Sequence, residues 1–198
     1  MQTRIILIRH GETRANRQRR YVGVTESGLT SYGRYQAKCL KERMAKDTID
    51  RIFVSPSKRA LDFSKIVFGN RKKKVLASLQ EMNFGVFEGL TYSQALKKYP
   101  LAYRKWLKSP QRFNIPKAEP LANFKARVFN ALKEIISANP GKSVALVTHG
   151  GPIMLMVGKI IKSKNLWKVM PGLASISIIE FNKNKPKILK LNDISHYK

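Results

Sequence analysis

Two short apolar runs, at residues 5–8 and 144–147, each end abruptly in a polar segment that contains a histidine followed by glycine. Neither run contains a polar residue. An apolar run of this length without alternation is typical of a strand that is buried on both faces, as in a parallel sheet covered by helices. Ligands of such sheets bind beyond the carboxyl ends of the strands. The sequence therefore predicts that His10 and His149 meet at one edge of a sheet.

The rest of the chain alternates between strand-like and helix-like patterns. Further strands are predicted at residues 52–54, 75–79, 174–181 and 188–191. Helices are predicted at residues 29–44, with Thr30 as N-cap, and at residues 59–67, 92–98, 101–107, 124–136 and from Pro152 onward. This alternation predicts an α/β three-layer sandwich, in which a mostly parallel central sheet carries helices on both faces. The 198 residues are enough for one domain, so we expect residues 1–198 to form a single unit.

The charge of the chain is strongly positive. Lys and Arg number 39 against 12 acidic residues, which gives a formal net charge of +27. Such a field attracts anions, including phosphate esters and nucleic acids. The basic residues are spread along the chain, however, whereas a nucleic-acid module concentrates them beside exposed aromatic residues. Nucleic-acid binding is therefore kept as a secondary hypothesis.

Cysteine content and hydropathy restrict the chemistry and the location. Cys39 is the only cysteine, which excludes an intramolecular disulfide and a cysteine-based metal site. We expect it to be a small buried hydrophobic residue. The apolar run near the N-terminus is too short for a signal peptide, and no run approaches the roughly 20 apolar residues of a spanning helix. We therefore expect a cytoplasmic protein without a membrane span.

The residues around the two histidines suit phosphoryl transfer. Arg9 precedes the first histidine, and Arg59 is expected on the first turn of the helix after residues 52–54. Guanidinium groups bind phosphoryl oxygens in forked geometry, and catalysis of this reaction is mainly electrostatic. An imidazole is largely unprotonated at neutral pH and can act as the nucleophile. We also expect helix N-termini after both histidines to supply backbone donors.

The leaving oxygen needs a proton, and Glu81 is the best candidate donor. It lies in a loop that contains Gly85 and Gly89. Burial or a neighbouring phosphate would have to raise the pKa of its carboxyl group. Glu88 in the same loop and Glu12 near the first histidine are the alternatives.

Taken together, six segments resemble the histidine phosphatase superfamily, which includes cofactor-dependent phosphoglycerate mutases and acid phosphatases. The sequence LIRHGET at residues 7–13, followed by Asn16, is similar to the signature of that family. The other segments are residues 23–30 with Gly33, Gln36 and Ala37, SPSKRA at residues 55–60, the loop at 79–91, VTHGG at 147–151 and residues 191–196. They occur in the family's order and extend over essentially the whole chain.

The resemblance implies a phosphoglycerate mutase-like fold and a metal-independent enzyme without an organic cofactor. It implies that His10 is phosphorylated and that Glu81 is the proton donor. It places these further residues in the site: Arg9, Arg59 and His149 around the phosphate, and Asn16, Gly23 and Gly150 along the substrate.

The chain departs from the family pattern in a few places. Glu26 stands at the acidic position before the first long helix, and Gly28 replaces a usual proline. Phe87 stands where tryptophan is frequent, and Ala-Glu-Pro at residues 118–120 replaces Gly-Glu-Ser. We expect these changes to affect the substrate side rather than the phosphate pocket.

Three functions are compatible with these motifs. The first is a phosphatase that hydrolyses a small phosphorylated metabolite through a phosphohistidine. The second is a cofactor-dependent phosphoglycerate mutase. In the family that the chain resembles, mutases usually carry extra segments after the general-acid loop and near the C-terminus. The chain is short there, which favours the phosphatase. The third is a polyanion-binding protein on the same fold, against which the intact motifs argue.

Trp106 and Trp167 are expected to pack in the interior, or one of them to cover the site.

Overall fold

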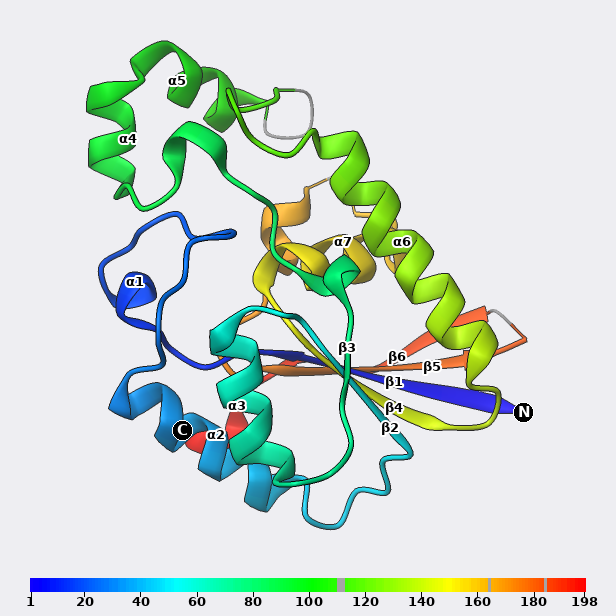
Figure 1. The fold of residues 1–198 in the computed structure, drawn as a ribbon. Helices are drawn as coiled ribbons and strands as arrows, with labels where there is room; N and C mark the ends of the chain where they lie inside the picture. Colours follow the sequence, from blue (N-terminus) through cyan, green and yellow to red (C-terminus); the bar gives the residue numbers. More distant parts are fainter. Residues whose placement is uncertain (110–112, 164, 184) are drawn as a thin grey trace.

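The computed structural model describes residues 1–109, 113–163, 165–183 and 185–198. Within them a six-stranded sheet runs through the molecule in the order β3-β2-β4-β1-β5-β6 (Figure 1). The strands are β1 Gln2–Arg9, β2 Arg51–Val54, β3 Lys74–Val75, β4 Ser143–Thr148, β5 Ile176–Asn182 and β6 Lys185–Asp193. Pairing is parallel from β3 to β1, whereas β5 is antiparallel to both of its neighbours. The mostly parallel sheet is confirmed; residue 184, between the predicted strands at 174–181 and 188–191, lies outside the described residues.

Helices cover both faces of this sheet, which confirms the three-layer sandwich. The α-helices are α1 Arg14–Arg17, α2 Ser31–Arg43, α3 Lys58–Phe68, α4 Tyr92–Lys98, α5 Pro100–Lys108, α6 Leu121–Ala138 and α7 Gly150–Ile160. Short 3-10 turns are η1 Ala77–Leu79, η2 Gly85–Phe87, η3 Leu166–Val169 and η4 Ser195–Tyr197. In Figure 1, α2 and α3 lie below the sheet and α6 and α7 above it. Thr30 caps α2 as predicted, since its hydroxyl accepts a hydrogen bond from Gly33 N.

The strand β1 is buried on both faces. Ile5 and Leu7 contribute to the core beneath α6 and α7, and Ile6 and Ile8 to the core against α2 and α3. Successive side chains of a strand point to opposite faces, so an unbroken apolar run is what two covered faces require. The continuous run at residues 5–8 is therefore explained by its central position between β4 and β5.

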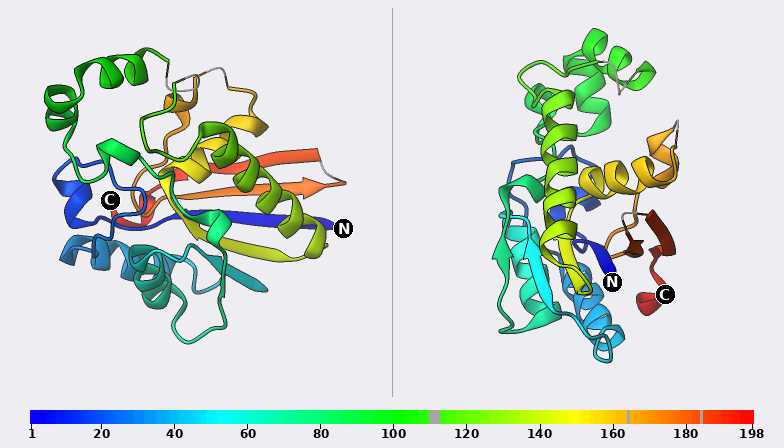
Figure 2. Two further views of the ribbon diagram at one scale, coloured as in Figure 1. Left: turned by 45° about the horizontal axis from the view of Figure 1, so that its top comes forward. Right: turned by 90° about the vertical axis from the view of Figure 1, so that its right-hand side faces the viewer.

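The helices α4 and α5 stand apart from the sheet, as both views of Figure 2 show. They have a small core of their own, in which Phe87, Tyr103, Trp106 and Ile115 are buried. The rings of Phe87 and Tyr103 meet at 5.7 Å between centroids. Phe87 thus packs inside this small core. We call α4, α5 and this core the cap. The phenylalanine at position 87, where tryptophan is frequent in the family, does not directly reach the substrate side.

Two local predictions were wrong. The strand expected at residues 75–79 consists only of Lys74–Val75, because after the bond from Leu76 N to Val54 O the chain turns into η1. That turn buries Leu79 completely and directs the following loop toward the ends of β1 and β4. Cys39 is half-buried instead of buried, since the face of α2 toward the sheet is formed by other positions such as Ala37 and Leu40.

Candidate active site

Two neighbouring strands bring the histidines together. Arg9 at the end of β1 is in register with Thr148 at the end of β4, so the next residue of each strand is a histidine at the same sheet edge. The rings of His10 and His149 lie 5.1 Å apart between centroids, with 67° between their planes. Both side chains are buried, at 4% and 1% exposure. The predicted meeting of the two histidines is confirmed.

A hydrogen bond determines which nitrogen of His10 is free. Its Nδ1 lies 2.7 Å from the carbonyl oxygen of Gly11. A carbonyl only accepts, so Nδ1 carries the proton and Nε2 keeps its lone pair. Burial, and then the charges of Arg59 and Arg9, hold the pKa of His10 well below its usual value. The ring is therefore neutral at physiological pH, with Nε2 available as a nucleophile.

His149 is held by two serine hydroxyls. Its Nε2 lies 2.7 Å from Ser55 Oγ and 3.2 Å from Ser57 Oγ, whereas its buried Nδ1 has no partner among the described residues. Burial is the main cause that lowers the pKa of this imidazole, and His10 adds to it. When the Ser55 hydroxyl donates a hydrogen bond to Nε2, the neutral ring carries its proton on Nδ1, which can donate a hydrogen bond to an anion. The sequence motif contained both serines, but nothing in it indicated this role.

The guanidinium of Arg59 is anchored by a backbone segment. It donates 2.7 Å to the carbonyl oxygen of Gly23 and 3.1 Å to that of Thr25, and its side chain is 1% exposed. A Cβ atom at Gly23 would lie 1.8 Å from the carbonyl oxygen of Met82, so only glycine fits there. Gly23 therefore contributes to the site through its backbone, by holding the arginine.

Arg9 and Gly150 lie next to each other at the start of α7. Arg9 donates 2.5 Å to the carbonyl oxygen of Pro171, and its buried Nε has no partner among the described residues. Gly150 opens α7, with His149 as N-cap, so backbone N–H groups and the positive end of a helix lie beside the histidine. A Cβ at Gly150 would lie 3.4 Å from Arg9 Cζ.

The corresponding expectation after His10 was wrong. The next helix, α1, begins only at Arg14 and has Thr13 as its own N-cap. Between His10 and this helix, Glu12 is hydrogen-bonded to Thr30, the N-cap of α2, and to Gln36 of α2. Asn16 belongs to that cap: its Oδ1 accepts hydrogen bonds from Thr13 N and Thr13 Oγ1. The same residue lines the cleft described below, where the sequence placed it.

Glu81 reaches the site from the loop after η1. Its carboxyl oxygens accept hydrogen bonds of 3.0 Å from Met82 N and from Gly151 N. Burial raises the pKa of Glu81, although these two bonds and the charges of Arg59 and Arg9 oppose the rise. A carboxyl group with a raised pKa is suited to hold a proton and donate it near neutral pH.

The two alternative carboxylates have other partners. Glu88 accepts hydrogen bonds from the backbone N–H groups of Gly23, Thr25 and Phe84, at 2.8–3.2 Å. Glu12 pairs with Arg17 at 3.0 Å and accepts a bond from the hydroxyl of Thr30. These contacts make both residues anchors of the surrounding backbone and favour Glu81 as the proton donor.

An ion pair supports the Glu81 loop, and sequence reasoning missed it. Arg127 on α6 donates to the carbonyl oxygens of Ser78, Gln80 and Glu81. It also forms a forked pair with Glu119, at 2.6 and 2.8 Å. The Ala-Glu-Pro segment at residues 118–120 keeps Glu119, the carboxylate that pairs with this arginine.

A cleft of about 1010 Å³ lies beside the Glu81 loop and the start of α7. Arg9, Asn16, Glu81, Gly150 and Gly151 are among its lining residues. His10, His149 and Arg59 do not line it in this structure; each histidine is the chain neighbour of a lining residue and is buried behind it. The cleft continues from Glu81 and Gly151 toward α4 and α5, which contribute Tyr92 and Trp106 to its lining.

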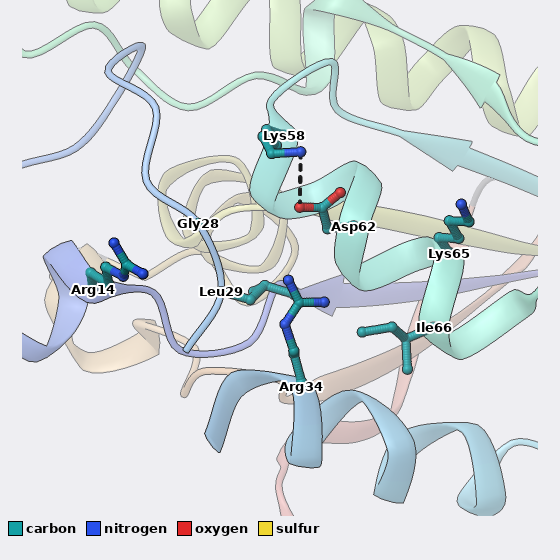
Figure 3. Close-up of a pocket in the computed structure, with 8 residues that line it drawn as sticks. All are labelled: Arg14, Gly28, Leu29, Arg34, Lys58, Asp62, Lys65 and Ile66. Atoms are coloured by element: carbon teal, nitrogen blue, oxygen red, sulfur yellow. Dashed lines mark ion pairs between the residues drawn. The ribbon is translucent and has the colours of Figure 1, made fainter. Parts of the chain in front are cut away.

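A second hollow, of about 610 Å³, shares no lining residue with the cleft (Figure 3). It is lined by Arg14, Gly28, Leu29, Arg34, Lys58, Asp62, Lys65 and Ile66, and Lys58 pairs with Asp62 at 3.4 Å. Its cations reflect the strong positive charge of the chain. Since no imidazole lines it, the hollow offers no nucleophile for phosphoryl transfer to a histidine.

Metal ligands and membrane-spanning helices are both missing from the described residues. No three His, Cys, Asp or Glu side chains in that part of the chain are grouped as metal ligands would be. No helix within the same ranges is long and apolar enough to cross a membrane.

Comparisons with known proteins agree with this geometry. A model of the histidine phosphatase superfamily (branch 1) matches residues 5–194. Phosphoserine phosphatase 1 of Hydrogenobacter thermophilus is 27% identical over 98% of this chain and 93% of that protein. The metal-independent phosphoserine phosphatase of Arabidopsis thaliana is 30% identical over 98% of this chain and 83% of its own. The α-ribazole phosphatase structure from Shigella flexneri superposes with a TM-score of 0.90 at 25% identity, over 96% of both chains. The chain therefore belongs to the histidine phosphatase superfamily, branch 1, and is a phosphatase of that superfamily.

Proposed function

We propose that the protein hydrolyses phosphomonoesters through a phosphohistidine formed on Nε2 of His10. The observation that carries this proposal is the hydrogen bond from His10 Nδ1 to the carbonyl oxygen of Gly11. This bond leaves the lone pair of the ring on Nε2. The centroid of the second imidazole ring, that of His149, lies 5.1 Å from the centroid of the His10 ring. Arg9, Arg59 and Nδ1 of His149 then supply the positive charge and the hydrogen bonds that a phosphoryl group needs.

The reaction consists of two transfers. In the first, Nε2 of His10 forms a bond to phosphorus while the ester P–O bond breaks, and Glu81 gives its proton to the leaving oxygen. In the second, the Glu81 carboxylate takes a proton from water as the water oxygen attacks phosphorus, and the bond from phosphorus to Nε2 breaks. The products are an alcohol and inorganic phosphate, and both His10 and Glu81 return to their first states.

The relatives support a phosphatase over a mutase. Two of them are named phosphoserine phosphatases and align with almost the whole of this chain. A mutase would return the phosphoryl group from His10 to a second hydroxyl group instead of to water. The difference lies in the acceptor alone, so it is decided by measuring the products.

The test is hydrolysis of p-nitrophenyl phosphate between pH 5 and 8 with a metal chelator present. We expect turnover in the wild type, none in His10→Ala, and normal turnover in His196→Ala, which removes a histidine that packs on Tyr197 outside the site. Rapid quenching should trap an acid-labile, base-stable phosphoenzyme in the wild type only. Full activity of His10→Ala would contradict the proposal, and so would phosphoglycerate isomerisation without release of phosphate.

A further inference from the structure

Beyond Glu81 the cleft is built mainly from aromatic and aliphatic side chains. The cap and its neighbouring loop contribute Tyr21, Phe84, Tyr92, Tyr103, Trp106 and Leu107. The opposite wall consists of Leu121, Phe124, Met154, Leu155, Leu166, Trp167 and Met170. Sites of this composition recognise the apolar body of a ligand, and a few polar groups orient it. The volume of about 1010 Å³ is at the upper end of the range for drug-sized ligands.

Two tryptophans, one from each wall, contact each other across this space. Trp106 of α5 and Trp167 of η3 meet edge to face, with 6.2 Å between ring centroids. Trp106 is 5% exposed, whereas Trp167 is 48% exposed and presents an aromatic surface to the cleft. A ligand that covers such an exposed apolar ring removes it from water, and this burial favours binding.

The charges along the cleft disfavour leaving groups that carry an ammonium group. Glu81 is the only carboxylate among the described lining residues, and both of its oxygens already accept backbone hydrogen bonds. The other charged groups of the lining are cations: Arg9, Arg20, Lys108 and Lys125. An ammonium group that enters such a cleft loses its hydration and finds no anion to pair with, which is costly. A leaving group like serine, which carries an ammonium, is therefore poorly matched to this lining.

Arg20 uses its Nε and Nη1 atoms to bind the protein itself, which leaves it less able to bind a substrate carboxylate. Its guanidinium donates to the carbonyl oxygen of Gly89 at 2.6 Å and to the side chains of Gln18 and Gln94 at 2.7 and 3.2 Å. It thereby ties the segment after α1 to the start of α4. The remaining cations of the outer cleft are Lys108, which is exposed, and Lys125.

We propose that the leaving group of the preferred substrate is a bulky, uncharged and mainly apolar alcohol, best with an aromatic ring, that lies between the cap and Trp167. This inference rests on the proposed phosphatase function and names the substrate class of the same site. It departs from the phosphoserine activity in the names of the two relatives, and from the small metabolite that the sequence predicts.

The test compares three esters that all leave as primary alkoxides: 2-phenylethyl phosphate, ethyl phosphate and O-phospho-L-serine. We expect kcat/KM for the phenylethyl ester to exceed both others by about 100-fold, since even a single methylene in an apolar pocket changes specificity 10- to 200-fold. Equal values for the phenylethyl and ethyl esters, or a preference for phosphoserine, would overturn the inference.

Variants locate the effect. Trp167→Ala should reduce the ratio of kcat/KM between the phenylethyl and ethyl esters by about 10-fold. Tyr35→Ala is the matched control, since Tyr35 is a similarly half-exposed aromatic residue, at 51%, that does not line the cleft. The control should keep the wild-type ratio. The ratio is the readout because partial unfolding would lower both rates and leave it unchanged; an unchanged ratio in Trp167→Ala would count against the inference.

A binding measurement separates the failure of the inference from the failure of the phosphatase function. 2-Phenylethylphosphonate and ethylphosphonate cannot be hydrolysed, and their Kd values can be measured by calorimetry on the wild-type protein. Tighter binding of the phenylethyl compound by about 100-fold without turnover of any ester would support the substrate class and contradict the phosphatase proposal. Equal Kd values together with normal turnover would do the reverse.

Discussion

The backbone N–H of Gly151 donates a 3.0 Å hydrogen bond to the carboxyl group of Glu81, across 70 residues of sequence. The contact leaves no room for a side chain, because a Cβ atom at Gly151 would lie 2.2 Å from Glu81 Oε1 and 2.9 Å from Phe124. The second glycine of the VTHGG segment therefore positions the carboxyl group that we propose as the proton donor, whereas the first, Gly150, lies against Arg9.

Gly151→Ala should consequently inactivate the enzyme. The added methyl group displaces the carboxyl group of Glu81, and losing a correctly placed general acid lowers kcat by about 100- to 10,000-fold. Gly28→Ala is the matched control: a Cβ atom at Gly28 would meet no heavy atom within 4 Å, so its kcat should fall by less than about 10-fold. Comparable losses in both variants, with both proteins folded by circular dichroism, would contradict the role assigned to Gly151.

Glu81→Gln should make the rate depend strongly on the leaving group. Without a proton donor, an alkyl phosphate must release an alkoxide, and we expect kcat to fall by about 100- to 10,000-fold. p-Nitrophenolate needs no proton to leave, so p-nitrophenyl phosphate should lose much less in the phosphorylation of His10. Burst-phase kinetics with both substrates measures this step. A uniform loss for the two substrates would indicate that Glu81 acts only in positioning.

A plot of kcat/KM against pH should be bell-shaped, with the acid limb set by His10 and the alkaline limb by Glu81. The nucleophile must be neutral, so activity falls as the pH drops through the pKa of His10, which burial holds well below its usual 6.5. The acid must be protonated, so activity falls as the pH rises through the pKa of Glu81, which burial raises above its usual 4.5. Measuring kcat/KM for an alkyl phosphate from pH 4 to 9 checks both limbs.

The Glu81→Gln variant also serves as the control for that profile. The substrate phosphate has a pKa near 6 of its own, which affects wild type and variant equally and cancels in their ratio. The ratio of kcat/KM, wild type over variant, should fall with rising pH because only the wild type loses its proton donor. A ratio that stays constant across the range would be evidence against Glu81 as the acid.

Glu88→Gln should weaken phosphate binding from a distance. The Glu88 carboxylate holds the backbone of Gly23 and Thr25, whose carbonyl oxygens in turn anchor Arg59. Replacing one oxygen by an NH₂ group places donor against donor. The cost of an unsatisfied buried donor, about 1–3 kcal/mol, is an upper bound here because Glu88 is half-buried. We expect KM to rise about 10-fold for any phosphomonoester, together with a lower Tm.

Glu134→Gln removes one negative charge from the exposed face of α6 and is the control for this experiment. It should leave KM and Tm at their wild-type values. Inhibition by inorganic phosphate gives an independent readout, since a loosened Arg59 should raise the inhibition constant in Glu88→Gln. A lower Tm with unchanged KM and unchanged phosphate inhibition would make Glu88 a structural residue only.

Much of the fold was accessible from local patterns. The apolar run at residues 5–8 identified β1 because a strand covered on both faces tolerates no polar residue. Helix boundaries followed from spacing and caps, as at Thr30. The prediction failed at residues 75–79, where apolar residues at positions 76 and 79 fit a strand and a 3-10 turn equally well. Packing of Leu79 into the core decided between the two.

The fold class, the two histidines at one sheet edge and the candidate proton donor could be read from the amino-acid sequence, because short motifs at strand ends carry that information locally. The groups that hold these residues became apparent in the folded chain: Ser55 against His149, Gly151 and Arg127 at the Glu81 loop, and Glu88 behind Arg59. The same holds for Trp106 and Trp167, which come from distant segments and meet across the cleft. Such contacts join residues dozens of positions apart, and their partners are set by packing of the layers rather than by any local pattern.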